Sequence, residues 1–546
     1  MRSIVVVLSA VCVAAVSAIG CGGSDDDTGP DTDTDTDTDA DSDTDTDTDT
    51  DTDTDSDTDT DTDTDSDTDT DTGTGTDTDT DIDTETDTDT ESDIDTDTDT
   101  DTGTDIDTDT DTDTDTDGPP DTECADNDTF DPTDCPAIDL SDPLVRRVDV
   151  DVATPGDGTT WTAAFELVQE GVDACACAAI ALDATCQVWV SEGTYQINQG
   201  DSCDTVRLRP GVELYGGFSG VETALDERNW LENETILDGE DYAAADADTD
   251  TDTDTDCDAD WDRVQHVVTG ADDAIIEGFT VVNGGWLRLC WEYQPGGGMF
   301  NDGVSPTIRN CKFAGNIGGP GGGMYNADNA AVIEGCTFAD NTGVTDGGGV
   351  YNENASTFIS RCIFLNNSAV HEEMLTETRG SAVCSNSGFT TIASSLFAAN
   401  HFSYNGDGVV RVSDGSIVGC TFASNNSYLP GHSTLDCSAC TVANSVFFGN
   451  ENASGLVIGV GTVSYTLVEG GYTGTGNIDA DPLFVDPSSA DFHLQPGSPC
   501  IDAADGDAGP EFDIEGNARF DDPDTTDTGI GAITYADMGA YEFQGE

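Results

Sequence analysis

The side chains best suited to chemistry gather in one short segment, residues 371–379. Five of them are ionisable: His371, Glu372, Glu373, Glu377 and Arg379. An imidazole beside carboxylates and a guanidinium could transfer protons or bind a polar ligand. Because a charged loop is more often a recognition surface or simply solvated, we treat this segment as a candidate binding loop and assign no catalytic residue.

Cation chemistry is suggested by alternating aspartates. Residues 31–117 are almost pure Asp-Thr, with 41 acidic residues and no basic one, and residues 248–256 repeat the pattern. Alternate carboxylates along an extended chain can bind calcium weakly, but the glycine turn and bidentate glutamate of a folded calcium loop are missing. Like-charge repulsion predicts a disordered acidic linker. We expect no cofactor beyond such weak calcium binding.

The cysteines divide into two groups. Sixteen of the 18 lie beyond the N-terminal leader. Twelve of these suit disulfides of an exported protein, with their connectivity left open, and the single Cys-x-x-Cys lacks the second pair of a zinc site, so no metal site is predicted. Four recur in one slot of a repeat and are expected to be small buried thiols: Cys311, Cys336, Cys362 and Cys420.

The charge balance limits the partners. The chain carries 115 acidic and 14 basic residues, a net charge of −101. A phosphate backbone needs clustered lysine and arginine, so the sequence excludes nucleic acid. The same negative field argues against a polyuronate substrate.

The N-terminus indicates export. Arg2 precedes an apolar run, residues 4–19, that is too short to span a bilayer and is followed by Gly20-Cys21. This arrangement resembles a bacterial lipoprotein signal, which implies that Cys21 is acylated and becomes the mature N-terminus. An ordinary secretory signal is the alternative. We expect a protein attached to the membrane by its N-terminal lipid, located in the bacterial cell envelope at the surface of the outer membrane.

A repeat fills residues 270–450. Its core is Cys-x-Phe-x-x-Asn, with serine replacing the cysteine twice, and its phenylalanines are 25, 26, 33, 25 and 25 residues apart. A glycine-rich element runs in step with it, as in residues 296–299 and 321–325. The step of 33 contains the candidate binding loop, whose extra residues must project from a turn.

The composition of each period determines the fold class. Each period is rich in Gly, Asn, Ser and Thr, lacks helical periodicity, and has room for three short strands and three turns. We predict an all-β fold, a right-handed parallel β-helix with about 25 residues per coil, in which phenylalanine points inward and asparagine bonds to its equivalents at a bend. The predicted structural ladders are Phe313, Phe338, Phe364, Phe397, Phe422 and Phe447, and Asn316, Asn341, Asn367, Asn400, Asn425 and Asn450.

These repeats resemble those of chlamydial polymorphic outer membrane proteins, and more widely bacterial parallel β-helix surface proteins. The segments Val188–Tyr195 and Gly211–Phe218 look like the opening coils of that group, and Asp537–Tyr541 looks like its closing segment. The resemblance covers residues 155–543 and implies architecture and a surface role. We expect no counterpart of the C-terminal barrel of the chlamydial proteins, so the resemblance implies only the surface role of their β-helical part.

The ends of an open β-helix need covers. Trp161, Phe165, Val168 and Val172 have helical spacing and predict a short capping helix for the first coil, while the Pro-rich closing segment covers the other end. The expected division is a lipoprotein signal (1–21), a disordered linker (22–122), an N-terminal cap with the first coils (123–240), an acidic loop insertion (241–260), regular coils (261–475) and a closing segment (476–546).

Three functions are compatible with this chain. Polysaccharide lyases share the fold but need a cation and a basic residue as catalyst, and glycosidases need paired carboxylates, for which Asp272-Asp273 with His432 forms no complete set. We therefore favour a lipid-anchored surface protein that binds a surface glycan or protein, and a non-enzymatic role over an enzymatic one. A carbohydrate-active enzyme, lyase or glycosidase, is the alternative, and a structural surface spacer is the second alternative.

Overall fold

Each repeat folds into one coil of short strands, because β-branched and aromatic positions alternate with turns of glycine and asparagine. In the computed structural model one coil contains β10 (Met299–Asp302), β11 (Thr307–Arg309), β12 (Lys312–Ala314) and β13 (Ile317–Gly318). Each strand pairs in parallel with its equivalent in the next coil, so that Phe313 lies opposite Phe338. The structure describes residues 130–136, 144–240, 263–285, 294–370, 378–402, 408–427, 433–451 and 456–545.

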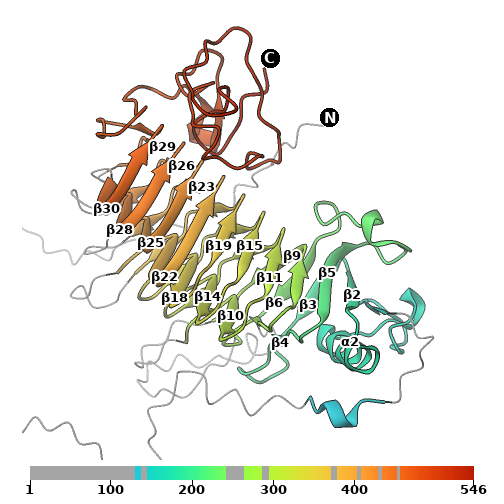
Figure 1. Cartoon of the computed structure of the whole chain (residues 1–546). Helices are drawn as coiled ribbons and strands as arrows, with labels where there is room; N and C mark the ends of the chain where they lie inside the picture. Colours follow the sequence, from blue (N-terminus) through green and yellow to red (C-terminus); the bar gives the residue numbers. More distant parts are fainter. Residues whose placement is uncertain are drawn as a thin grey trace, which may run out of the picture. The chain divides into compact units, whose positions relative to one another are not determined.

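Stacking of the coils forms three parallel sheets (Figure 1). The largest runs β1-β2-β5-β8-β11-β15-β19-β22-β18-β14-β10-β7-β4, with β25, β28 and β30 continuing from β22. Its further strands are β1 (Val145–Val148), β2 (Cys186–Ser191), β4 (Val206–Arg207), β5 (Val212–Phe218), β7 (Val268–Thr269), β8 (Ile275–Glu277), β14 (Met324–Ala327), β15 (Val332–Glu334), β18 (Val350–Glu353), β19 (Phe358–Ser360), β22 (Val383–Ala393), β25 (Val410–Val418), β28 (Leu435–Ala443) and β30 (Leu456–Ser464).

The other two sheets complete the coil. The second contains β3 (Gly193–Gln196), β6 (Thr235–Asp238), β9 (Phe279–Val282), β12, β16 (Thr337–Ala339), β20 (Ile363–Leu365), β23 (Leu396–Ala398), β26 (Thr421–Ala423), β29 (Val446–Phe448) and β31 (Leu467–Val468). The third contains β13, β17 (Thr342–Gly343), β21 (Ser368–Ala369), β24 (His401–Phe402) and β27 (Asn426–Ser427). The prediction of a right-handed parallel β-helix is confirmed.

The interior is organised in ladders. The six phenylalanines of the repeat stack from coil to coil, with ring centroids 4.4 to 5.0 Å apart and planes within 8° of parallel. At the neighbouring bend, Nδ2 of Asn341 donates to Oδ1 of Asn367 at 2.9 Å and to the carbonyl of Phe313. The same bonds recur from Asn316 to Asn450. Each coil is therefore held by the same apolar and polar contacts as its neighbours.

A second asparagine ladder lies where the glycine-rich element enters β10, β14 and β18. Nδ2 of Asn301 donates to Asn326, Asn326 donates to Asn352, and Asn352 donates to the hydroxyl of Ser385, each at 2.9 Å. The glycines of this element were recognised from the sequence, but its asparagines were not. Their spacing of 25 and 26 residues was the signal that could have identified them.

The cysteine prediction is confirmed for the repeated slot. Cys311, Cys336, Cys362 and Cys420 are buried free thiols, and burial raises the pKa of Cys420 to about 12. Serines occupy the slot in two coils, as Ser395 and Ser445, and Oγ of Ser395 accepts from the backbone amide of Cys362 at 3.1 Å. Small side chains with one polar atom fit this slot because each bonds the adjacent backbone.

Three disulfides lie at the ends of the coil stack: Cys135–Cys177, Cys175–Cys186 and Cys437–Cys440. Cys203 is also disulfide-bonded. The expectation that all twelve non-repeat cysteines form disulfides is wrong for Cys384 and Cys500, which are buried free thiols. Cys384 faces Tyr351 and Arg411 in the sheet register, and Cys500 packs in an apolar cluster, so neither lies opposite a described cysteine.

The N-terminal cap differs from the predicted helix. Trp161 lies in a 3₁₀ turn, η2 (Trp161–Ala163), and Phe165 forms a parallel bridge with Val148. The helix begins later, as α2 (Val168–Leu182), and packs on β1, β2 and β5. Trp161 fails to join it because its indole Nε1 donates to the carbonyl of Glu222 at 2.9 Å and its ring packs on Phe218.

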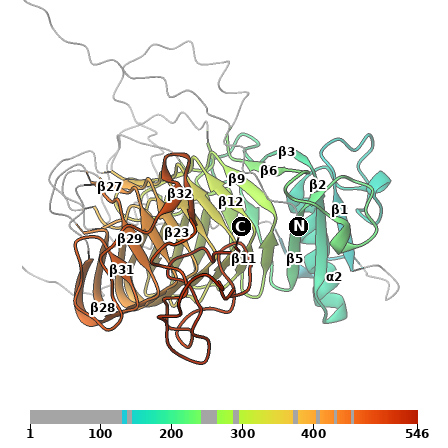
Figure 2. The same cartoon turned by 90° about the horizontal axis from the view of Figure 1, so that it is seen from above.

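The closing segment packs on the side of the β-helix as well as at its end. Its strands β32 (Phe484–Asp486) and β33 (Asp491–Leu494) form an antiparallel pair, joined by the 3₁₀ turn η4 (Pro487–Ser489). Its apolar side chains share one cluster with the outward-facing Leu396, Ala423 and Val446. Figures 1 and 2 show this segment in dark red beside β23, β26 and β29, with α2 at the opposite end of the stack.

Two further 3₁₀ turns complete the described elements, η1 (Pro132–Asp134) and η3 (Leu225–Glu227). All described residues belong to one compact unit, which lies within residues 110–546. The leader with Cys21, the Asp-Thr linker and the acidic insertion at 248–256 lie outside the described residues. Within the described residues, no helix is long and apolar enough to cross a bilayer.

Candidate functional site

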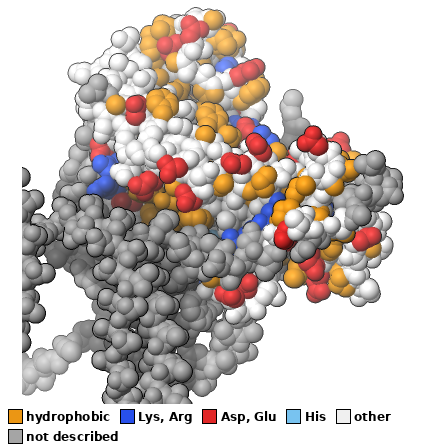
Figure 3. All heavy atoms as spheres, turned by 60° about the horizontal axis from the view of Figure 1, so that its bottom comes forward, with side chains coloured by type: hydrophobic (Ala, Val, Ile, Leu, Met, Phe, Trp, Pro, Cys, Tyr) orange, Lys and Arg blue, Asp and Glu red, His pale blue; other side chains and the backbone are white. Residues whose placement is uncertain are grey.

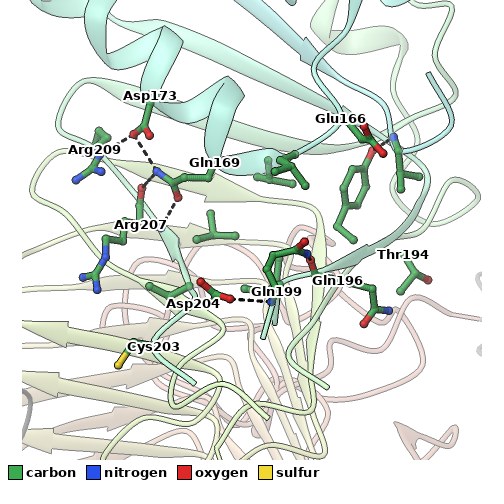
Figure 4. Close-up of a pocket in the computed structure, with 17 residues that line it drawn as sticks. Glu166, Gln169, Asp173, Thr194, Gln196, Gln199, Cys203, Asp204, Arg207 and Arg209 are labelled. Atoms are coloured by element: carbon green, nitrogen blue, oxygen red, sulfur yellow. Dashed lines mark hydrogen bonds and ion pairs between the residues drawn. The ribbon is translucent and has the colours of Figure 1, made fainter. Parts of the chain in front are cut away.

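A pocket opens between the capping helix and the first coils (Figure 4). Its cavity volume is about 420 Å³, within the range of small-ligand sites. Three stretches form it: the start of α2 with the residues before it (166–169), strand β3 with its continuation (194–197), and the chain around β4 (203–209). This pocket was not predicted from the sequence, because its residues come from segments that occur once and belong to no repeat.

The polar side of the pocket is held by a connected set of bonds. Nε2 of Gln169 donates to Asp173 at 2.9 Å, and Oε1 of Gln169 accepts from the amide of Arg207 at 2.8 Å. Nε of Arg209 forms an ion pair with Asp173 at 3.0 Å, and its guanidinium lies over the ring of Phe130. The Arg207 and Arg209 backbone is thereby fixed against α2, so this wall of the pocket is preformed.

The opposite side offers amide, hydroxyl and apolar groups. Gln196, Gln199 and Thr194 line it, and the backbone N–H of Gln199 donates a hydrogen bond to the carboxylate of Asp204 at 2.7 Å. Tyr195 lies behind them, where burial raises the pKa of its hydroxyl to about 12 and so keeps it protonated. Val150, Leu167 and Ile197 add apolar surface. This mixture of neutral hydrogen-bonding groups and short apolar patches suits a polyhydroxylated ligand.

The candidate binding loop is placed at a turn by the sheet register. Thr342 and Val350 are eight residues apart, whereas their partners Ser368 and Val383 are 15 apart, so seven residues are inserted between β21 and β22. His371, Glu372, Glu373 and Glu377 lie outside the described residues. Arg379 is half-buried and forms a parallel bridge with Asp346 on the preceding coil.

The weaker catalytic candidates Asp272 and Asp273 have structural roles. Oδ1 of Asp272 accepts the amide of Ser305 at 2.8 Å, and Asp273 has φ of 55°. Both residues therefore shape the turn before β8. His432 lies outside the described residues. The single Cys-x-x-Cys is closed as the Cys437–Cys440 disulfide and is not available as a pair of zinc ligands.

The closing segment contains two ionisable groupings. Nδ1 of His493 bonds the carboxylate of Asp491 at 2.6 Å, and Nε2 bonds that of Glu515 at 3.2 Å. The bond to Glu515 is the main cause that raises the pKa of His493 to about 9, so the imidazole donates to both carboxylates. A protonated imidazole between two carboxylates is a structural cation. Elsewhere, oxygens of Asp502, Asp521 and Asp527 lie within 4.8 Å of one another, an arrangement able to bind a metal ion.

No family model matches the sequence, and no curated protein is similar to it. Two of the solved structures that the chain resembles are carbohydrate-active proteins. A crystal structure of the pectate lyase Pel9A has a TM-score of 0.37 and 13% identity, covering 73% of this chain and 96% of that one. Pectin methylesterase from carrot has a TM-score of 0.31 and 11% identity, covering 60% and 90%. Both are parallel β-helix proteins, and at these scores the likeness says nothing about activity.

Proposed function

We propose that this protein is a lipid-anchored surface protein that binds a neutral glycan in the pocket between α2 and the first coils. The observation that carries the proposal is the pocket itself, a preformed cavity of about 420 Å³ lined by three glutamines and by threonine, arginine and acidic side chains. Sugar hydroxyls both donate and accept hydrogen bonds, and amide side chains can satisfy both roles. The apolar patches suit the C–H face of a sugar ring.

The charge of the surface favours a neutral ligand over an acidic one. The chain has a net charge of −101, and Figure 3 shows acidic side chains spread over the visible described surface with few basic ones. An anionic polysaccharide would be repelled at long range. Arg209, a cation at the pocket wall, is paired with Asp173 and so adds little attraction.

A substitution that fills the pocket tests the proposal. Thr194 is exposed on β3 and lines the pocket, so Thr194→Trp should obstruct the cavity without removing a core contact. We expect at least a tenfold loss of binding on a neutral-glycan array, with an unchanged Tm. Thr280→Trp is the matched control, because Thr280 follows Thr194 and Ile236 in the same column of the sheet and does not line the pocket.

Two variants separate this proposal from its rivals. If the loop at 371–379 binds the ligand instead, deletion of residues 370–378 will abolish glycan binding and Thr194→Trp will not. If the protein is an enzyme, incubation with polysaccharides will release products, and the carbohydrate-active alternative replaces the binding one.

The lipid anchor has its own test. Cys21→Ala should release the protein from membranes or block its maturation, because acylation of that cysteine is the proposed attachment. Cys12→Ala, within the apolar run of the leader, is the control. Normal membrane retention of the Cys21→Ala protein would contradict lipid anchoring and leave the pocket proposal standing.

A further inference from the structure

The closing segment brings three aspartates together from two stretches of chain. Asp502 follows the buried Cys500 and Ile501, while Asp521 and Asp527 belong to the exposed loop 521–529. That loop is held against Asp502 by its backbone, since the amides of Thr528 and Gly529 donate to the carbonyl of Asp502 at 2.8 and 3.0 Å. One carboxylate oxygen from each aspartate can thus meet the others within 4.8 Å.

Asp502 is unusual among the buried acids of this segment. Its side chain is completely buried, and neither carboxylate oxygen has a hydrogen-bond partner. Other buried acids have hydrogen-bond partners. Asp537 accepts hydrogen bonds from the backbone amides of Asp502 and Phe543. Glu542 accepts one from the backbone amide of Phe520 and forms an ion pair with Arg519. A buried carboxylate with no partner costs several kcal/mol unless it is protonated or binds a cation.

No basic side chain of the described residues neutralises this group. The one arginine of the closing segment, Arg519, forms an ion pair with Glu542 at 2.6 Å, and His493 is paired with Asp491 and Glu515. Three carboxylates therefore converge on one point without a described counter-charge.

We propose that Asp502, Asp521 and Asp527 bind a calcium ion that fastens the closing segment to itself. All three donors are hard oxygens, which favours calcium or magnesium over zinc. Calcium accepts six to eight oxygens in a flexible geometry, whereas magnesium demands a near-ideal octahedron, so three carboxylates from two stretches of chain suit calcium better. Water molecules would complete the coordination on the exposed side, where Asp521 and Asp527 lie.

The site lies where it can stabilise the cover of the β-helix. Asp505, three residues beyond Asp502, exchanges two hydrogen bonds with Asn444, both at 2.8 Å, and Asn444 belongs to the coil stack. The amide of Gly539 also donates to the carbonyl of Asn444 at 2.7 Å. A calcium ion that joins residue 502 to the loop 521–529 would therefore tighten the segment that packs on β23, β26 and β29. This site is separate from the Asp-Thr linker and does not depend on the proposed function.

The test is a calcium titration of the full-length protein at constant ionic strength. Calcium at 10 mM should raise the Tm by about 2 °C or more with saturation near millimolar concentrations, and magnesium should give less than half of that rise. Hydrogen exchange of the Thr528 and Gly529 amides should slow several-fold in calcium. A wild-type protein in which calcium changes neither the Tm nor this exchange would overturn the proposal.

Three variants separate this site from calcium held by the acidic linker, which all of them retain. Asp502→Asn and Asp527→Asn should each raise, at least tenfold, the calcium concentration needed for half of the rise in Tm. Asp527 is exposed, so its variant remains informative if Asp502→Asn fails to fold. Asp524→Asn removes the same charge from an exposed position of the same loop and should respond like the wild type. Equal responses of Asp527→Asn and Asp524→Asn would contradict the site.

Discussion

The regular coils and the closing segment are stabilised in opposite ways. In the coils, buried polar groups are mostly neutral amides, hydroxyls and thiols, many of which repeat in ladders, as with Asn341 and Asn367. In the closing segment, buried polar groups are mostly carboxylates, among them Asp502, Asp537 and Glu542, each in a different setting. The coils contain long sheets, whereas the closing segment has one short antiparallel pair.

The difference shows how each region depends on its surroundings. A neutral ladder keeps its hydrogen bonds at any pH and without any ion, because no member changes charge near neutrality. A buried carboxylate is stable only while its charge is matched by amides, by an arginine or by a cation. We therefore expect the coils to supply stability that is independent of solution conditions, and the closing segment to respond to pH and to calcium.

The largest effect is expected from removing a ring of the coil interior. Phe364 is fully buried between Phe338 and Phe397, at centroid distances of 5.0 and 4.8 Å. Phe364→Ala should lower the free energy of unfolding by about 3–5 kcal/mol, measured by chemical denaturation. Phe389→Ala is the control, because that side chain is 49% exposed. Equal losses for the two variants would show that the stack contributes no more than surface contacts.

A smaller loss is expected from breaking the polar ladder. The amide of Asn367 bonds the carbonyl of Phe338 and the side chains of Asn341 and Asn400. Asn367→Ala should cost roughly 2–3 kcal/mol, since it leaves buried groups of both adjacent coils unpaired, and this loss should be the same at pH 5 and pH 8. The exposed Asn386→Ala serves as the control. A strongly pH-dependent loss would contradict the contrast between the two regions.

The third prediction concerns Asp502→Asn, whose effect on stability should change sign between calcium-free and calcium-containing buffer. The pKa of Asp502 is raised from the usual 3.8 to about 6, so its charge destabilises the folded state as pH rises from about 4 through 6, with Asp521, Asp522, Asp527 and Asp537 facing it. In calcium-free buffer at pH 7, Asp502→Asn should therefore be more stable than the wild type, by on the order of 1–2 kcal/mol, with no gain at pH 4.

Melting in a calcium chelator across this pH range measures the effect, with Asp524→Asn as the control. In excess calcium the order should reverse, because only the wild type can bind the ion through all three carboxylates. A stability difference between Asp502→Asn and the wild type that does not vary with pH would contradict this account of the closing segment.

The smallest effect is expected from the acidic linker. Deletion of residues 31–117 should change the Tm of the folded part by about 1 °C or less, because a self-repelling chain of Asp and Thr has nothing to bury. Thermal denaturation of the shortened protein checks this. A large loss of stability would mean that the linker packs on the coils or acts on them through bound calcium.

The coils were predictable because the same residue types recur at the same positions of each coil. Six occurrences of one element identified the inward phenylalanines and the bend asparagines, and the composition of each period, with its lack of helical periodicity, excluded helices. The capping helix was placed too early, because Trp161 and Phe165 have helical spacing but take part in other contacts, with Glu222 and Val148. An apolar period that occurs once can be satisfied by more than one structure.

The two sites were beyond the reach of sequence patterns for a different reason. The pocket joins residues 166–173 with residues 194–209, and no spacing relates them before the chain folds. Asp502, Asp521 and Asp527 are three of 115 acidic residues, and only burial distinguishes the first of them. The candidate loop at 371–379 was found by its irregular spacing, and its role as a binding site stays a prediction.

The in-register pairing of the coils has a consequence for how such a chain can change in length. Lys312–Ala314 pairs with Thr337–Ala339, and that strand pairs with Ile363–Leu365, so both faces of the middle coil meet equivalent partners. Duplication of one 25-residue unit there would reproduce the same stacked rings and amide bonds at each new junction. Neither α2 nor the closing segment would need to adapt, provided that the coils beneath the closing segment stay intact. The distance between the two ends of the molecule can therefore evolve in steps of about one strand spacing, ~4.8 Å, by recombination within the gene.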